Sequence, residues 1–394
     1  MPTERLARLA ALSVFATMFL WGFSEAIASL ATQWPIVPAH AYLYLLLAMP
    51  VGLVSGNLTM GHLADKYGRK PVMVVAPAIY VAGVALIAAA TDWWLLALGV
   101  GVLVFSLGGG DEPALISYLA EVSPEASRGP LLMLASNGAN VAAAAAAAAF
   151  VLAGADFRLQ RIALVATLAL ALPLAILVRM RLPESAAWRR ARGAPRAFRA
   201  LGDPARLYFL ISVAITTVLT YGLVSWAVGP YYYPSSASLI ILLFNLGAIV
   251  GGLLGYATIE RSGRRALSLA YFAGGLASAA AIAFQLIESP GDFPLFAALL
   301  VVNGAFAQLT WGIRLLMEAE LFRTASRATS IAIVRTSAWA LYMASLAFTE
   351  SFTVTSFMAY DVALWALGTS GAAIWAALGY ETRGKAIEEL DSLA

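Results

Sequence analysis

The stretch Gly61–Lys70, GHLADKYGRK, lies between two long apolar runs and recurs half a chain later as Tyr256–Arg265, YATIERSGRR. Asp65 of the first copy corresponds to Glu260 of the second, an offset of 195 residues. A repeat at about half the length of a 394-residue chain indicates an internal duplication.

Two further pairs recur in the same order. EVSPEASR at Glu121–Arg128 corresponds to ELFRTASR at Glu320–Arg327, and PES at Pro183–Ser185 to YET at Tyr380–Thr382. Duplicated halves in a membrane protein are typical of secondary transporters.

The composition indicates an integral membrane protein. Apolar residues make up 61 % of the chain and charged residues 12 %, against about 25 % charged in ordinary soluble domains. The apolar runs are continuous rather than alternating, which favours helices over a barrel. We therefore expect an all-α membrane protein with twelve transmembrane helices in two pseudo-symmetric six-helix bundles. The expected spans lie near 8–32, 38–62, 70–91, 93–119, 129–153, 158–182, 205–229, 236–259, 266–288, 293–317, 326–351 and 356–379.

The domain limits follow from these spans. We expect an N-terminal bundle over 1–182, a basic linker over 183–204, a C-terminal bundle over 205–379 and a tail over 380–394. The linker carries Trp188 and Phe198 among arginines. Two interpretations stay open: it lies along the inner leaflet, or it is a solvated tether.

Basic residues predict the orientation. With both termini inside, nearly all arginines and lysines between spans face the cytoplasm, and only Arg158 and Arg161 face outward. We expect a multi-pass protein of the cell membrane, in contact with the lipid bilayer, with both termini cytoplasmic. The net charge of +3 then reflects topology and not nucleic-acid binding. The first apolar run is too long for a signal peptide, so we expect it to be retained.

The loop G-x-L-A-D-x-x-G-R-K resembles the signature of the major facilitator superfamily. PES at Pro183–Ser185 and ETRGKAIEEL at Glu381–Leu390 are similar to sugar-porter segments, and GGGDEP at Gly108–Pro113 resembles a motif of phosphate:proton symporters. The resemblance implies the major facilitator fold. It leaves the branch open, because the fourth span lacks the arginine typical of sugar porters.

The same resemblance implies an inner gate held by ion pairs. Two clusters are expected, Asp65–Arg128–Glu184 and Glu260–Arg327–Glu381. The alternative is that these charges only fix the topology. The expected gate residues are Asp65, Gly68, Arg69, Glu121, Arg128, Glu184, Glu260, Arg264, Glu320, Arg327 and Glu381.

Ionisable groups inside spans are costly and therefore indicate function. Asp111 and Glu25 are the first candidates for proton coupling, followed by Glu112. Two alternatives stay open: Asp111 forms a structural pair with Arg314 or Arg335, or Glu25 faces an outer vestibule.

Polar and aromatic side chains within spans suit a small polar substrate. Arg314 either binds an anionic group or is neutralised by Glu318, four residues away. The tryptophans either line the cavity or face lipid. The candidates for substrate binding are Asn137, Asn140, Tyr221, Asn303, Gln308, Trp311, Arg314 and Trp339.

Together these features predict proton-coupled symport of a small polar metabolite, a sugar or an organic anion, by alternating access. The alternatives are an uncoupled facilitator or exporter of the same fold, and a transport-dead sensor or scaffold. An enzyme is disfavoured, because the chain has no nucleotide-binding loop and its two histidines, His40 and His62, are far apart. We expect no cofactor, no metal and a monomer, since one chain holds both bundles.

Overall fold

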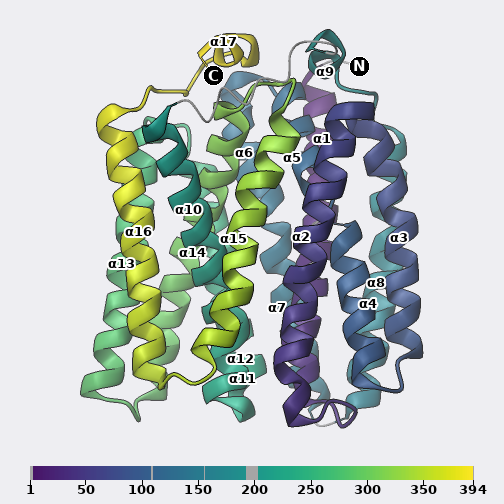
Figure 1. Ribbon diagram of the computed structural model, residues 1–394, viewed down its shortest axis with the longest axis vertical. Coiled ribbons are helices and arrows are strands. Elements are labelled where there is room, and N and C mark those ends of the chain that lie inside the picture. Colours follow the sequence, from purple (N-terminus) through teal and green to yellow (C-terminus); the bar gives the residue numbers. More distant parts are fainter. Residues whose placement is uncertain (1–2, 108–109, 155, 192–202, 394) are drawn as a thin grey trace.

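The computed structural model describes residues 3–107, 110–154, 156–191 and 203–393. These residues form helices and no strand (Figure 1). Eleven helical segments are long and apolar enough to cross a membrane, and the shorter α4 belongs to a twelfth span. The prediction of an all-α membrane protein with twelve spans in two bundles is confirmed. Gly108, Gly109 and the linker residues 192–202, Phe198 included, lie outside the described part.

The first bundle, hereafter the first lobe, contains eight helices that make six spans. They are α1 (Thr3–Leu30), α2 (Tyr42–Tyr67), α3 (Arg69–Ala89), α4 (Trp93–Ser106), α5 (Glu112–Val122), α6 (Glu125–Ser136), α7 (Gly138–Ala153) and α8 (Phe157–Met180). Short 3-10 turns, η1 (Ala31–Gln33) and η2 (Ala39–Ala41), connect α1 to α2.

The second lobe repeats this plan. Its helices are α10 (Pro204–Gly222), the π-helical turn η4 (Leu223–Ala227), α11 (Val228–Tyr232), α12 (Ala237–Thr258), α13 (Arg264–Glu288), α14 (Phe293–Leu321), α15 (Arg327–Thr349) and α16 (Val354–Leu378). A 3-10 turn, η5 (Pro234–Ser236), precedes α12, and two short helices lie outside the spans, α9 (Ala186–Ala191) and α17 (Ile387–Leu393).

The fourth span is interrupted where one continuous helix was expected. α4 ends at Ser106, Leu107 is extended, and α5 starts after Asp111. Pro113 lies in the first turn of α5, where its missing N–H costs nothing. The proline therefore begins a new helix instead of bending one helix, and Asp111 and Glu112 come to lie at the break.

Glycines allow the same close helix contact in both lobes. A Cβ on Gly52 would collide with the carbonyl oxygen of Gly101, so α2 lies directly on α4. The equivalent Gly247 lies against the Val301 carbonyl, so α12 lies directly on α14. Small residues that let helix backbones approach are the usual means of packing helices in membranes.

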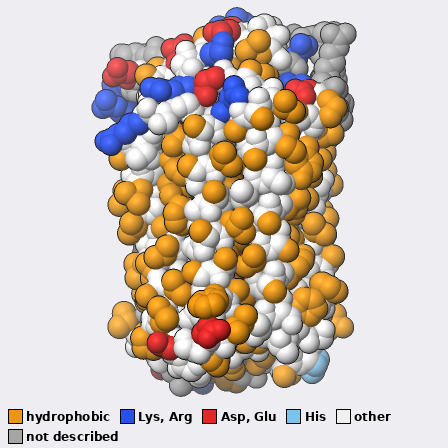
Figure 2. Space-filling view, turned by 90° about the vertical axis from the view of Figure 1, so that its left-hand side faces the viewer, with side chains coloured by type: hydrophobic (Ala, Val, Ile, Leu, Met, Phe, Trp, Pro, Cys, Tyr) orange, Lys and Arg blue, Asp and Glu red, His pale blue; other side chains and the backbone are white. Residues whose placement is uncertain are grey.

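The two lobes meet along two seams. α2 packs against α15 at one seam, and α6 and α7 pack against α12 at the other. Both termini lie at the same end of the molecule, hereafter the terminal end (Figure 1). Charged side chains gather at that end, and hydrophobic ones cover the middle of the face in Figure 2.

The glycine contact gives a matched pair of variants. Gly52→Ala places a methyl group on the Gly101 carbonyl, whereas a Cβ on Gly101 finds only the Ala48 oxygen, at 3.4 Å. Overpacking typically costs about 1–3 kcal/mol. We expect Gly52→Ala to lower the thermal unfolding temperature in detergent and Gly101→Ala to leave it nearly unchanged. Equal changes in the unfolding temperatures of the two variants would show that the close contact between α2 and α4 does not limit the stability of the protein.

Candidate functional site

Five charged side chains form a buried cluster between the lobes, hereafter the central cluster. They come from α1, α5, α14 and α15, and none exposes more than 2 % of its surface. The members are Glu25, Glu112, Arg314, Glu318 and Arg335.

One ion pair of the central cluster crosses the lobe interface. The guanidinium of Arg335, on α15, pairs with Glu112 at the start of α5. Arg314 instead pairs within its own helix, with Nη1 2.9 Å from Glu318. Glu25 lies in electrostatic range of Glu112 and Arg335. Its Oε1 has no hydrogen-bond partner among the described residues.

Trp311 is an aromatic platform beneath both arginines. The Cζ atom of Arg314 lies 4.4 Å from the ring centroid and that of Arg335 lies 5.9 Å from it, within the range of cation–π attraction. The rings of Trp21, on α1, and Tyr221, on α10, each lie 5.5 Å from the Trp311 ring. Two cations of the second lobe and aromatic rings from both lobes therefore lie together at the lobe interface.

Amide side chains extend this polar region toward α12. The Tyr221 hydroxyl lies 2.9 Å from Oδ1 of Asn140 and 2.7 Å from Oδ1 of Asn245. Asn140 donates to Oδ1 of Asn137 at 2.8 Å, and Asn137 donates to the Ile249 carbonyl of the other lobe at 3.1 Å. We call Asn137, Asn140, Tyr221 and Asn245 the amide row.

The remaining substrate candidates make separate contacts. Gln308 donates to Ser136 of the first lobe at 2.9 Å, so it also bridges the interface. Trp339 packs edge-on against Tyr342, 5.4 Å between centroids. Asn303 donates to Ser278 of α13 at 3.0 Å, inside the second lobe.

Asp111 is separate from the central cluster. Its Oδ2 lies 2.7 Å from Nη2 of Arg179, on α8. The partners expected from the sequence, Arg314 and Arg335, pair with Glu318 and Glu112 instead. Sequence reasoning overlooked Arg179, because an arginine near the end of a span is usually a topology signal.

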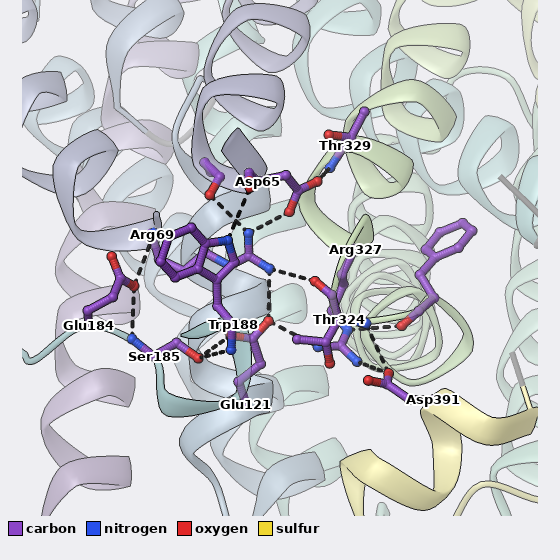
Figure 3. Close-up of polar contacts among 12 residues, drawn as sticks. Asp65, Arg69, Glu121, Glu184, Ser185, Trp188, Thr324, Arg327, Thr329 and Asp391 are labelled. Atoms are coloured by element: carbon purple, nitrogen blue, oxygen red, sulfur yellow. Dashed lines mark hydrogen bonds and ion pairs between the residues drawn. The ribbon is translucent and has the colours of Figure 1, made fainter. Parts of the chain in front are cut away.

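A second set of buried ion pairs lies at the terminal end, hereafter the terminal-end network (Figure 3). Nη1 of Arg69 lies 2.5 Å from Asp65, and Nη2 lies 2.9 Å from Oε1 of Glu121. The same Glu121 oxygen lies 3.0 Å from Nη1 of Arg327, which belongs to the other lobe. Thr329, also of the other lobe, donates its backbone N–H to Asp65 at 2.7 Å.

The other half of the terminal-end network has the same form. Arg264 lies 2.6 Å from Glu260 and 3.7 Å from Oε2 of Glu320. Oε1 of Glu320 lies 3.4 Å from Nη1 of Arg128, which belongs to the first lobe. Each lobe therefore supplies one arginine that pairs with a glutamate of the other lobe.

These contacts correct the expected grouping of the gate residues. Arg128 was expected beside Asp65 and Glu184, and Arg327 beside Glu260. The two arginines have exchanged places, because each lies in the first turn of a helix that packs on the opposite lobe. Arg327 lies in α15, which packs on α2, and Arg128 lies in α6, which packs on α12.

Glu184 and Glu381 are helix-capping residues in this arrangement. Glu184 accepts from the backbone N–H groups of Arg69 and Lys70, both at 3.1 Å, at the start of α3. Glu381 accepts from the N–H of Arg264 at 2.8 Å, at the start of α13. A carboxylate at a helix N-terminus is favourable.

Gly68 permits the approach of Glu184. Its φ of +117° suits glycine, and a Cβ there would overlap Oε2 of Glu184. The terminal-end network therefore depends on a glycine as well as on its charges.

The tail and linker also join the terminal-end network. Asp391, on α17, lies 3.1 Å from Arg327 and accepts from the Thr324 N–H at 2.9 Å. Trp188, on α9, is buried and donates to the Asp65 carbonyl at 3.1 Å. Sequence reasoning missed Asp391, because an acid in a charged tail carries no signal of its partner.

The chain is similar in sequence and in fold to known transporters. A family model for sugar and other transporters matches residues 11–203. The 3-(3-hydroxy-phenyl)propionate transporter of Escherichia coli K12 is 29 % identical over 241 residues, 59 % of this chain and 59 % of that protein. The proton:xylose symporter XylE bound to 6-bromo-6-deoxy-D-glucose superposes with a TM-score of 0.81 at 15 % identity, over 99 % of this chain and 98 % of that one.

The chain has the fold of major facilitator superfamily transporters. A further member of the superfamily is also similar in fold: the fucose:proton symporter FucP of E. coli, as a single-substitution variant, has a TM-score of 0.65 at 16 % identity, over 92 % of this chain and 97 % of that one. The proteins named here are transporters or symporters, and none is an enzyme. The chain spans 59 % of the length of the curated 3-(3-hydroxy-phenyl)propionate transporter.

The terminal-end network predicts that the Glu121 carboxylate contributes strongly to the stability of the protein. Glu121→Gln leaves Arg69 and Arg327 facing a neutral side chain, and breaking a buried pair typically costs about 3–5 kcal/mol. We expect the variant to unfold at a markedly lower temperature in detergent. The control, Glu388→Gln, breaks the exposed pair with Arg190 and should change the unfolding temperature little. Equal shifts would mean that the buried pairs do not hold the lobes together.

Proposed function

We propose that this chain is a member of the major facilitator superfamily and a proton-coupled symporter of a small aromatic carboxylate. The observation that carries the proposal is the pair of buried arginines, Arg314 and Arg335, over the ring of Trp311. A guanidinium binds a carboxylate through two parallel hydrogen bonds. The rings of Trp21 and Tyr221 beside Trp311 offer faces for an aromatic ring.

The relatives support this class of substrate and this coupling. The relative that aligns over 241 residues is named as a transporter of 3-(3-hydroxy-phenyl)propionate, an aromatic carboxylate. The structural neighbours XylE and FucP are named as proton symporters. Both properties are carried to this chain as part of the proposal.

Charge balance explains why a proton would accompany the substrate. The central cluster holds three carboxyl groups and two guanidinium groups. A bound carboxylate adds one more negative charge to a buried site, which is costly unless a proton neutralises it. We assign this proton to Glu25, whose Oε1 has no partner among the described residues, with Glu112 as the second carrier.

The transport step follows from competition for Arg335. A substrate carboxylate bound to Arg335 displaces Glu112, and this removes an ion pair that joins the lobes. The lobes then rock about the central cluster, and the terminal-end network exchanges its pairs for water. We assign the terminal end to the cytoplasm, because basic side chains gather there on the face shown in Figure 2.

A sugar is the second candidate substrate. The amide row presents carboxamide and hydroxyl groups that suit the hydroxyls of a sugar, and the matching family model covers sugar transporters. In that case Arg314 and Arg335 would stay paired with their glutamates during transport.

Uptake into proteoliposomes separates these proposals. We expect 3-phenylpropionate to accumulate when the outside is acidic and xylose not to accumulate. Arg335→Lys keeps the charge but loses the planar fork, so it should reduce 3-phenylpropionate uptake by roughly tenfold. Accumulation of xylose would support the sugar proposal. Carboxylate uptake that ignores the pH gradient would identify an uncoupled facilitator, and no uptake of either compound would contradict transport of both classes.

The proton site has its own test. Glu25→Gln should abolish accumulation driven by a pH gradient and retain exchange of labelled for unlabelled 3-phenylpropionate, because substrate contacts remain. Asp361→Asn is the matched control, since Asp361 is an equally buried acid on α16; it should keep both activities. Accumulation driven by a pH gradient in the Glu25→Gln protein would rule out Glu25 as the carrier.

A further inference from the structure

Asp111 and Glu112 are neighbours in sequence and pair in opposite directions. Asp111 pairs with Arg179 inside the first lobe, whereas Glu112 pairs with Arg335 of the second lobe. The break between α4 and α5 makes this possible, because Asp111 precedes α5 and Glu112 is its first residue.

Arg179 joins the start of α5 to three other helices. Its guanidinium lies 2.7 Å from Asp111, donates to the Thr17 hydroxyl of α1 at 2.5 Å, and donates to the Met73 carbonyl of α3 at 2.9 Å. Its side chain is 1 % exposed. The first residues of α5 are therefore attached to α1, α3 and α8 through one side chain.

The short helix α5 then carries two inter-lobe pairs. Glu112 at its first residue pairs with Arg335, and Glu121 near its end pairs with Arg327. Both arginines lie on α15. At a rise of 1.5 Å per residue, the two pairs are separated by about 12–14 Å along each helix. A shift at the start of α5 therefore moves the partners of both arginines.

We propose that Arg179 and Asp111 are positioning residues, which hold the start of α5 so that Glu112 reaches Arg335 across the lobe interface. This inference rests on the proposed function, in which Glu112 and the substrate compete for Arg335. Arg179 binds the carboxylate of Asp111 inside the first lobe. The role of Asp111 is therefore to position Glu112 and not to carry the transported proton.

Neutralising both partners separates positioning from proton transfer. Removing one partner of a buried pair leaves an uncompensated charge, whereas removing both does not. We expect Asp111→Asn and Arg179→Gln each to lower pH-driven accumulation of 3-phenylpropionate by roughly tenfold or more. The double variant should recover most of the accumulation, but with a displaced pH profile, because Glu112 is no longer held on Arg335. Asp361→Asn is the control and should keep the wild-type profile.

Two outcomes would overturn the proposal. A double variant that exchanges 3-phenylpropionate but does not accumulate it would show that Asp111 carries the proton. A double variant with the wild-type pH profile would show that the pair is only structural.

A second measurement does not depend on transport. The chain contains no cysteine, so Ala328→Cys places a single thiol on α15 at the lobe interface, where Ala328 is fully buried. We expect a water-soluble maleimide to label this thiol several times faster in the Asp111→Asn/Arg179→Gln background than in the Asp361→Asn background.

Unchanged labelling in the double variant would contradict the positioning role. If the wild-type protein transported no carboxylate and labelling still increased, the proposed function would fail while the positioning of α5 would stand.

Discussion

Buried charge at the lobe interface is the constraint on which the rest of the structure depends. Arg327 pairs with Glu121, and Arg128 pairs with Glu320, so each lobe neutralises a buried arginine of the other. A buried ion is costly without its partner. The lobes can therefore separate at this end only where water replaces the lost partners, and the pairs favour the closed terminal end.

In the central cluster, away from the terminal end, buried charges of the two lobes also need each other as partners. There Glu112 and Arg335 join the lobes, and Glu25 lies beside them. The central cluster and the terminal-end network share α5 and α15, which carry the Glu112–Arg335 and Glu121–Arg327 pairs. A ligand that takes one partner of the central pair thus acts on helices that also hold the terminal end. Coupling of this kind needs rigid elements, and the start of α5 is held by the pair between Arg179 and Asp111.

The sequence predicted the fold, because apolar runs and the duplicated loops report directly on spans and halves. The charged residues that it named for the gate lie at the terminal end, but Asp391 was not among them. The sequence did not predict their partners: Arg128 and Arg327 face opposite lobes, which depends on how α6 and α15 pack. Arg179 was missed because its partner, Asp111, is remote in sequence and has another acid beside it. Asn303 donates a hydrogen bond to Ser278 inside the second lobe. No local sequence pattern predicts this contact.

Under the proposed function, a carboxylate and a proton enter the central cluster together. The most direct test is the pH change of a weakly buffered solution of purified protein when 3-phenylpropionate is added near neutral pH. We expect uptake of about one proton per bound ligand, and no proton uptake in the Glu25→Gln protein. Saturable binding without proton uptake would contradict it.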